Sequence, residues 1–326
     1  MTEEHLDENY REKVLPYWDH YGRTGHFQGV DDVRIEYMTF IREDEVGAIV
    51  ISSGRAESFV KYQEVIYDLG NQGYSIYIHD HRGQGFFERL IPDKPQVGHI
   101  ESFAHYVLDL KYFVDHVVNQ RPHKSLFFIA HSMGGTVASL YIQTYKDDVD
   151  AAILSAPMHE LHIGWLPVNA ACKIVRIRKR FTSTPQDYAP GQGPYQGELL
   201  FDVKTNIYTH SELRFNKFRE VYRLRPGVRL GGPSNRWLHQ ACKAARKARN
   251  EAGETTIPVL ILQASLDRAV TSRGQRIYCR NLNARRPGRC ELFVLEGAKH
   301  EPYIERDDYR IPALEKTLDF MAAHGR

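Results

Sequence analysis

The chain has 326 residues, of which 42% are hydrophobic and 11% aromatic, and its formal net charge at pH 7 is +2. This size suits one large catalytic domain with a substantial core, and the composition excludes a disordered chain or several ordinary domains. No run approaches the roughly 20 consecutive apolar residues that span a membrane, and the first residues are acidic, unlike a secretory signal; we therefore expect an intracellular soluble or peripheral protein.

Short apolar strands alternate with amphipathic helices in the first half of the chain. Residues 33–39 alternate between apolar and polar side chains, as in a half-buried strand. The pattern then predicts strands at 48–51, 75–79, 126–130 and 152–155, and helices at 59–69, 103–119 and 134–145. Apolar strands separated by helices favour an α/β fold with a mostly parallel sheet covered on both faces.

The alternation stops at Met158 and resumes after Thr256. The stretch between them holds basic, helix-like pieces and no clear strand, and its 17 Lys and Arg against 8 Asp and Glu give a net charge of +9, whereas the rest of the chain has −7. About a hundred residues exceed an ordinary loop, so we predict a basic helical cap at 158–256 inserted between core parts 1–157 and 257–326. The later elements are expected as strands at 259–263 and 291–295 and helices at 273–281 and 312–323.

The four cysteines are Cys172, Cys242, Cys279 and Cys290, and their spacing resembles neither a C-x-x-C pair nor a zinc site. In a chain expected inside the cell, this pattern favours free thiols. A bridge between Cys279 and Cys290 is the alternative that the sequence leaves open. No group of His, Asp or Glu has metal-ligand spacing, so neither a metal nor another cofactor is expected.

Ser132 is the candidate nucleophile. It lies in the run Phe-Ile-Ala-His-Ser-Met-Gly-Gly, between the strand 126–130 and the helix that opens at Gly134. This context is typical of the nucleophile elbow, a sharp turn that exposes the hydroxyl at the carboxyl edge of the sheet and needs small residues on both sides. Ala130 stands where the usual G-x-S-x-G pattern has its first glycine. A serine that merely caps a helix is the alternative interpretation.

A serine hydroxyl needs a base that a carboxylate orients. In this fold the acid and the histidine follow the nucleophile in that order, each after a late strand. Asp267 follows the first strand after the insertion, and His300 follows the second. We therefore predict Ser132, Asp267 and His300 as a catalytic triad, with Glu296 and Glu301 as the alternative carboxylates. The constellation indicates a serine hydrolase.

Two further groups near the nucleophile can be assigned from its position. The developing oxyanion needs two N–H donors: we predict that Met133, directly after the nucleophile, is one, and that the backbone of Arg55 in the loop after the strand 48–51 is the other. Gly54, which permits an unusual turn there, is the second choice. His131 is expected to point away from the hydroxyl, because neighbours on a tight turn diverge, and to pack or form a structural hydrogen bond.

Six segments carry a resemblance to a known family. They are Ser-Ser-Gly-Arg-Ala-Glu-Ser-Phe-Val-Lys-Tyr-Gln-Glu, Asp-His-Arg-Gly-Gln-Gly, Ala-His-Ser-Met-Gly-Gly, Ala-Pro-Met, Asn-Ile-Tyr-Thr-His-Ser and Gly-Gly-Pro-Ser-Asn-Arg-Trp. Together they resemble the bacterial lysophospholipase L2 family and, more distantly, the monoacylglycerol lipases. The likeness runs from about residue 15 to the end, and the last two segments, in the predicted cap, are the more specific.

The resemblance implies an α/β-hydrolase with Ser132 as nucleophile, His300 as base and Asp267 as the acid. It implies hydrolysis of the remaining acyl ester of a lysophospholipid, with release of a fatty acid and a glycerophosphodiester and with acyl transfer as a side activity. It also implies a cytoplasmic protein on the cytoplasmic face of the inner membrane. The alternatives are a monoacylglycerol lipase or broad carboxylesterase with the same residues and, in another class, a membrane lipid-binding protein with a vestigial site.

The predicted cap holds features that suit a membrane lipid. Leu161, Ile163, Trp165, Leu166 and Val168 form an apolar run, and five Lys and Arg lie within 173–180. Basic residues near an anionic surface contribute about 1 kcal/mol each, and apolar neighbours can enter the interface. We therefore expect peripheral contact with an anionic membrane and no nucleic-acid partner. A solvated basic helix over a packed cap is the alternative.

Overall fold

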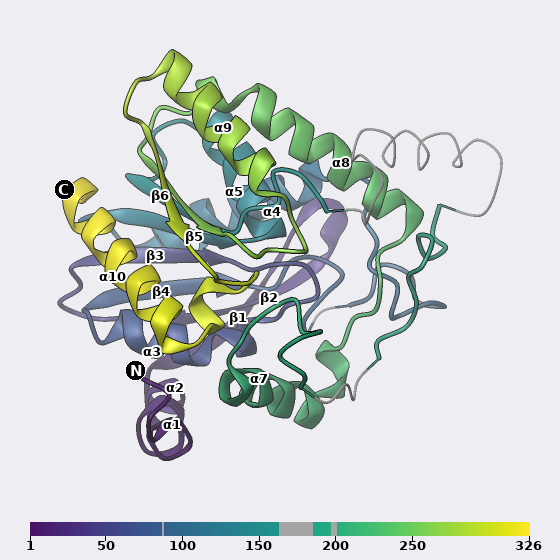
Figure 1. Ribbon diagram of the computed structural model, residues 1–326, viewed down its shortest axis with the longest axis horizontal. Coiled ribbons are helices and arrows are strands. Elements are labelled where there is room, and N and C mark those ends of the chain that lie inside the picture. Colours follow the sequence, from purple (N-terminus) through teal and green to yellow (C-terminus); the bar gives the residue numbers. More distant parts are fainter. Residues whose placement is uncertain (87, 163–184, 197–200) are drawn as a thin grey trace.

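An eight-stranded sheet forms the centre of the computed structural model, which describes residues 1–86, 88–162, 185–196 and 201–326 (Figure 1). Its strand order is β1-β2-β4-β3-β5-β6-β7-β8, antiparallel where β2 pairs with β1 and β4 and parallel elsewhere. The strands are β1 (Gly22–Gln28), β2 (Arg34–Phe40), β3 (Gly47–Ser52), β4 (Tyr74–His79), β5 (Leu126–His131), β6 (Ala151–Ser155), β7 (Val259–Ala264) and β8 (Cys290–Leu295). The predicted mostly parallel sheet is thereby confirmed.

Burial explains which strands the sequence revealed. Every residue of β3 to β7 is buried, because helices cover both faces of the sheet, and such strands have continuous apolar runs. The edge strand β1 has only Phe27 buried, so it lacks the alternation that identified β2. It was not predicted for that reason.

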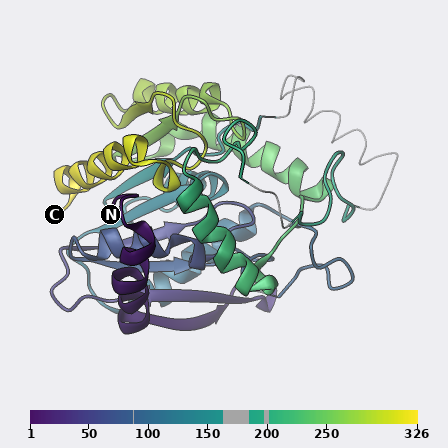
Figure 2. The same cartoon turned by 60° about the horizontal axis from the view of Figure 1, so that its bottom comes forward.

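Helices pack on the two faces of the sheet around two separate cores. One core unites β-strand side chains with α4, α5, α8 and α9, and the other unites them with α2, α3 and α10. The helices are α1 (Leu6–Asn9), α2 (Leu15–Tyr21), α3 (Gln63–Gly70), α4 (Ala104–His116), α5 (Met133–Thr144), α7 (Glu212–Leu224), α8 (Asn235–Asn250), α9 (Ser272–Arg285) and α10 (Asp307–His324). Figure 2 brings the N-terminal helices and α7 forward. Among the described helices, none combines the length and apolarity needed to cross a membrane.

The inserted stretch is attached closely to the core. Trp237, Ala241 and Ala244 of α8 are buried in the same cluster as α5, and Gln143 Nε2 of α5 donates to the Ala248 carbonyl at 2.8 Å. The second half of the predicted cap therefore forms part of a covering layer. The apolar run from Ile163 and the basic run 173–180 lie outside the described residues, so the cap boundaries stay a prediction.

The prediction of free thiols is wrong for the described cysteines. Cys279 on α9 and Cys290 on β8 form a disulfide, and Cys242 is also disulfide-bonded. The chain returns from α9 directly into β8, which brings the two Cα atoms to 5.3 Å, well within the range that a disulfide spans. The alternative that the sequence left open, a Cys279–Cys290 bridge, is the arrangement found.

Candidate active site

Ser132 forms a sharp turn between β5 and α5. Its φ of 51° and ψ of −114° lie in a region that side-chain-bearing residues rarely adopt. Two backbone hydrogen bonds hold this conformation: Ser132 N–H donates to the Ser155 carbonyl at 3.0 Å, and Met158 N–H donates to the Ser132 carbonyl at 2.8 Å. The turn places the hydroxyl at the carboxyl edge of the parallel strands.

Small residues around the serine are required by close backbone approach. A Cβ on Gly134 would collide with the carbonyl oxygens of Ser52 and Ser53, and one on Gly135 would lie 2.7 Å from Pro157 Cβ. Ala130, by contrast, is fully buried within the core on β5. The alanine methyl group is thus part of the core at the position where glycine is usual.

The structure brings the three predicted triad side chains together. His300 Nε2 lies 2.9 Å from Ser132 Oγ, and His300 Nδ1 lies 2.7 Å from Asp267 Oδ2. Asp267 Oδ1 accepts from the N–H groups of Ala269 and Val270 at 2.8 and 3.0 Å, which fixes the carboxylate. The acid and histidine side chains are nearly inaccessible to solvent, at 1% and 5% exposure. The imidazole is thus held between a hydroxyl and a buried carboxylate.

The alternative carboxylates lie elsewhere. Glu296 is exposed on the surface. Glu301 is buried, but its carboxylate accepts from Lys61 Nζ at 2.6 Å. Neither side chain takes the place of Asp267 beside the imidazole.

Two backbone N–H groups near Ser132 are available to an oxyanion. Met133 is the first residue of α5, where the N–H has no acceptor within the helix. The Arg55 N–H donates to no acceptor among the described residues, whereas the Gly54 N–H already donates to Glu57 Oε2 at 2.6 Å. The geometry therefore favours Met133 and Arg55 over Gly54.

Gly54 permits the turn in this loop through the space that it leaves, and not through a left-handed backbone conformation. Its φ is outside the left-handed region, and the residue with positive φ in this loop is Ala56, at 61°. Glycine is required at position 54 for space, because a Cβ there would lie 2.6 Å from Glu57 Oε1 and 2.9 Å from His131 Nδ1.

The inserted stretch contributes to the surroundings of the triad. The Tyr208 ring lies 6.4 Å from the His300 ring, and the Tyr208 carbonyl accepts from Glu301 N–H at 2.9 Å. Arg55 Nη1 donates to the Gly231 carbonyl at 2.9 Å, and its guanidinium carbon lies 5.7 Å from the Trp237 ring centroid. The segments predicted as cap from sequence likeness thus approach the loop that contains Arg55 and the loop that contains His300.

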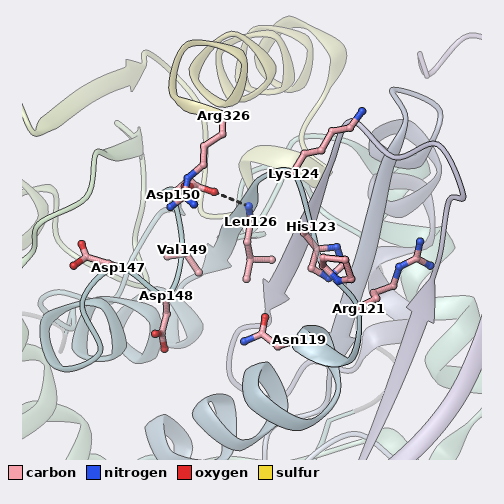
Figure 3. A pocket seen from close by; sticks show the side chains of 11 residues that line it. Asn119, Arg121, His123, Lys124, Leu126, Asp147, Asp148, Val149, Asp150 and Arg326 are labelled. Atoms are coloured by element: carbon pink, nitrogen blue, oxygen red, sulfur yellow. Dashed lines mark hydrogen bonds and ion pairs between the residues drawn. The ribbon is translucent and has the colours of Figure 1, made fainter.

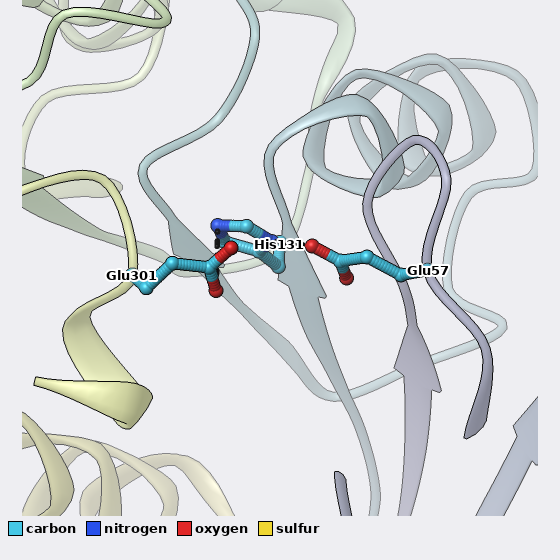
Figure 4. A group of neighbouring side chains, drawn as sticks. All are labelled: Glu57, His131 and Glu301. Atoms are coloured by element: carbon cyan, nitrogen blue, oxygen red, sulfur yellow. Dashed lines mark hydrogen bonds and ion pairs between the residues drawn. The ribbon is translucent and has the colours of Figure 1, made fainter. Parts of the chain in front are cut away.

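A buried group of charged side chains beside the triad was missed from the sequence (Figure 4). The group consists of Glu57, His131 and Glu301. Each offers one side-chain atom of a type that can bind a metal ion, and these atoms lie within 4.8 Å of one another. They come from the end of β5 and from two loops far apart in the chain, so no spacing pattern indicates the group. Adjacency to the predicted triad in the sequence could have indicated two members of the group, since His131 precedes Ser132 and Glu301 follows His300.

A separate cavity of about 340 Å³ lies at the opposite end of the sheet (Figure 3). It is lined by residues before β5 and around β6, including His123, Asp148 and Asp150, and by Arg326. These side chains stand at the amino edge of β5, whereas Ser132 follows its carboxyl end. The cavity therefore has no part in the site around the triad.

The strand order, the elbow and the Ser132–His300–Asp267 geometry define a serine hydrolase of the α/β-hydrolase class. Solved structures share this fold. A monoglyceride lipase variant from Saccharomyces cerevisiae has a TM-score of 0.70 at 21% identity, covering 93% of this chain and 96% of that one. A carboxyl esterase from Bacillus coagulans has a TM-score of 0.71 at 16% identity, with coverage of 93% and 98%.

The chain belongs to the family described as serine aminopeptidase, S33, whose model matches residues 43–307, and within it to the relatives named lysophospholipase L2. It is 35% identical over 305 residues to lysophospholipase L2 of Escherichia coli K12, covering 91% of this chain and 87% of that protein. A probable lysophospholipase L2 of Haemophilus influenzae is 29% identical, with 95% of each chain covered. A monoacylglycerol lipase of Mycolicibacterium smegmatis is 24% identical, with coverage of 91% and 96%. The predicted resemblance is confirmed.

Proposed function

We propose that this protein hydrolyses the acyl ester of lysophospholipids, releasing a fatty acid and a glycerophosphodiester through an acyl-enzyme. The observation that carries the proposal is the His300 imidazole, which contacts Ser132 Oγ at 2.9 Å and Asp267 Oδ2 at 2.7 Å. The similarity to lysophospholipase L2 of Escherichia coli supports the choice of ester.

The reaction divides into two halves, acylation and deacylation, and His300 transfers the protons in both. His300 Nε2 takes the proton of Ser132 Oγ as the oxygen attacks the ester carbonyl, and Asp267 stabilises the imidazolium through Nδ1–H. The Met133 and Arg55 N–H groups bind the oxyanion. His300 then protonates the leaving glycerol oxygen. In the second half, it removes a proton from the water that attacks the acyl-serine, and it gives this proton to Ser132 Oγ as the acyl–oxygen bond breaks and the fatty acid leaves.

The Arg55 side chain supports a phosphate-bearing substrate. Its guanidinium adjoins the oxyanion loop, and within the described residues no carboxylate lies at ion-pair distance from it. A guanidinium whose charge no neighbouring carboxylate balances is suited to bind a phosphate group. The negative charge of its phosphate distinguishes a lysophospholipid from a neutral monoacylglycerol.

A monoacylglycerol lipase or broad carboxylesterase is the second candidate, because relatives and structural neighbours have those names. A panel of lysophosphatidylcholine, lysophosphatidylethanolamine and monoolein, assayed with the native protein, Ser132→Ala and His300→Ala, separates the two. We expect turnover of the lysolipids to exceed that of monoolein and to vanish in both variants. A clear preference for monoolein would overturn the proposed substrate.

Labelling by a fluorophosphonate probe tests the remaining alternative, a lipid-binding protein with a vestigial site. We expect the probe to label the native protein and to leave Ser132→Ala unlabelled. Equal labelling of the two proteins, or labelling of neither, would favour the binding protein.

We further propose a cytoplasmic location with peripheral contact to the anionic face of the inner membrane. The net charge of +9 over residues 158–256 supports this contact, because cationic segments are attracted to anionic lipid.

A further inference from the structure

Four charged side chains lie buried together beside the triad, and Figure 4 draws three of them, Glu57, His131 and Glu301. They are Glu57 in the loop after β3, Lys61 in the short helix Phe59–Tyr62, His131 at the end of β5 and Glu301 after the base. Their side chains are between 5% and 9% exposed. Charged groups with so little access to water must compensate one another.

Lys61 contacts both carboxylates of this cluster. Its Nζ lies 2.8 Å from Glu57 Oε1 and 2.6 Å from Glu301 Oε1, so the ammonium bridges the two carboxylates. Two negative charges then face one positive charge. A second positive charge is needed for neutrality, and His131 is positioned to supply it.

Both ring nitrogens of His131 face acceptors. Nδ1 lies 3.0 Å from Glu57 Oε1, and Nε2 lies 3.1 Å from the backbone oxygen of His300 and 3.6 Å from Glu301 Oε2. A neutral imidazole donates from only one nitrogen, so this arrangement fits the doubly protonated ring. Burial lowers the pKa of His131, but Glu301 and Glu57 oppose burial and together raise this pKa to about 9.

The cluster joins the three parts of the active site. His131 precedes the nucleophile and donates to the backbone of the base, His300. Glu57 accepts from His131 through one oxygen and, through the other, from Gly54 N–H at 2.6 Å, next to the proposed oxyanion donor Arg55. Tyr62 also donates to that second oxygen, at 2.5 Å.

We propose that His131, held as an imidazolium by Glu57 and Glu301, is a positioning residue that fixes the loop of the base and the oxyanion loop relative to the nucleophile. This inference rests on the proposed roles of Ser132 and His300. It assigns His131 no contact with the substrate.

Paired substitutions separate the charge of His131 from its shape. His131→Gln keeps a donor near Nε2 but leaves the cluster with one excess negative charge. The double variant His131→Gln with Glu301→Gln keeps the donor and restores neutrality. We expect His131→Gln to slow fluorophosphonate labelling of Ser132 and to lower kcat/KM on a short p-nitrophenyl ester by about 100-fold, because small misplacements of catalytic groups cost that much. We expect the double variant to recover most of the loss.

The pH dependence of the labelling rate tests the charge of His131. A side chain that only packed would give no change of rate with its protonation. The charged and titratable groups around His131 are Glu57, Lys61, Glu301 and the His300 ring, whose centroid lies 4.9 Å away. The two carboxylates raise the pKa of Lys61, against the effect of burial, so it stays protonated. A raised pKa means that native His131 keeps its proton at neutral pH and loses it as the pH rises through about 9. The labelling rate should fall there in the native protein and not in the double variant.

Thermal unfolding of each variant identifies any that fails to fold. If His131→Gln does not fold, the double variant is compared with the native protein instead. A folded His131→Gln that labels at the native rate would overturn the inference, as would a folded double variant that is slow or keeps the alkaline fall. Failure of the native protein to label at Ser132 would instead contradict the proposed function. The two failures are therefore distinguishable.

Discussion

At the scale of single residues, the site depends on positions where no larger side chain fits. The positive φ of Ser132 is possible because Gly134 and Gly135 let the turn approach the loop after β3 and Pro157. Strain at a nucleophile of this kind is held by surrounding contacts, not by the residue itself. The elbow is thus specified by its neighbours.

Gly134→Ala tests this close approach. The added Cβ meets two backbone carbonyl oxygens, which cannot move away as a side chain would, so we expect a loss of about 3 kcal/mol in the free energy of unfolding. Urea denaturation measures it. Gly227→Ala is the matched control, because no atom lies within 4 Å of its added Cβ. Equal stability of the two variants would contradict the steric argument.

Asp267→Asn tests the acid. The amide cannot stabilise the imidazolium and permits the wrong tautomer of His300, so we expect kcat to fall on the order of 10⁴-fold with little change in folding. Steady-state kinetics on a lysolipid measures the effect. Glu296→Gln, which alters the exposed alternative carboxylate, should retain native kcat; a larger loss in this control than in Asp267→Asn would transfer the role to Glu296.

At the scale of elements, apolar periodicity predicted the β/α core because buried strands and amphipathic helices repeat with fixed periods. Asp267 and His300 could be placed for a related reason, since the carboxyl ends of parallel strands meet at one edge of the sheet. The polar edge strand β1 has no such period. The Cys279–Cys290 bridge and the Glu57–His131–Glu301 group depend on distances between segments, which periodicity does not encode.

Helix α7 illustrates how the insertion is anchored. The fully buried Arg214 donates to Glu64 of α3 at 3.0 Å and to Asp307 of α10 at 2.8 Å. Its Nη1 also donates to the Glu305 carbonyl at 2.7 Å, in the loop that follows His300. One guanidinium thus ties α7 to two core helices.

Arg214→Met should therefore be strongly destabilising. Removal of the cation leaves carboxylates without their buried partner, and such losses amount to about 3 kcal/mol or more. The midpoint of urea unfolding reports the change. Arg223→Met on the exposed side of the same helix should leave the midpoint nearly unchanged; if both variants unfold alike, the buried ion pairs do not anchor α7.

At the scale of the whole molecule, charge is divided unevenly along the chain. Residues 158–256 carry +9 and the remainder −7, so a small net charge conceals a strong asymmetry. Attraction between exposed charges and lipid is weakened by salt. The proposed membrane contact should consequently weaken as the salt concentration rises.

Co-sedimentation with lipid vesicles tests this dependence of membrane binding on salt. We expect binding to vesicles rich in phosphatidylglycerol, weak binding to pure phosphatidylcholine, and release as salt rises from about 0.05 to 0.5 M. Neutralisation of Arg176, Arg178, Lys179 and Arg180 to Gln should reduce binding. The matched control replaces four exposed basic residues outside 158–256, namely Lys13, Lys124, Arg286 and Arg289. Equal loss in both variants would show that net charge alone governs binding.

The position of Arg326 has a practical consequence for immobilised catalysts. Its backbone N–H donates to Ser125 Oγ at 2.7 Å and its guanidinium pairs with Asp150 at 2.7 Å, beside the amino end of β5. Ser132 follows the other end of that six-residue strand, about 20 Å away at ordinary strand rise. A resin or electrode coupled at Arg326 would therefore hold the enzyme with its catalytic edge facing the solution.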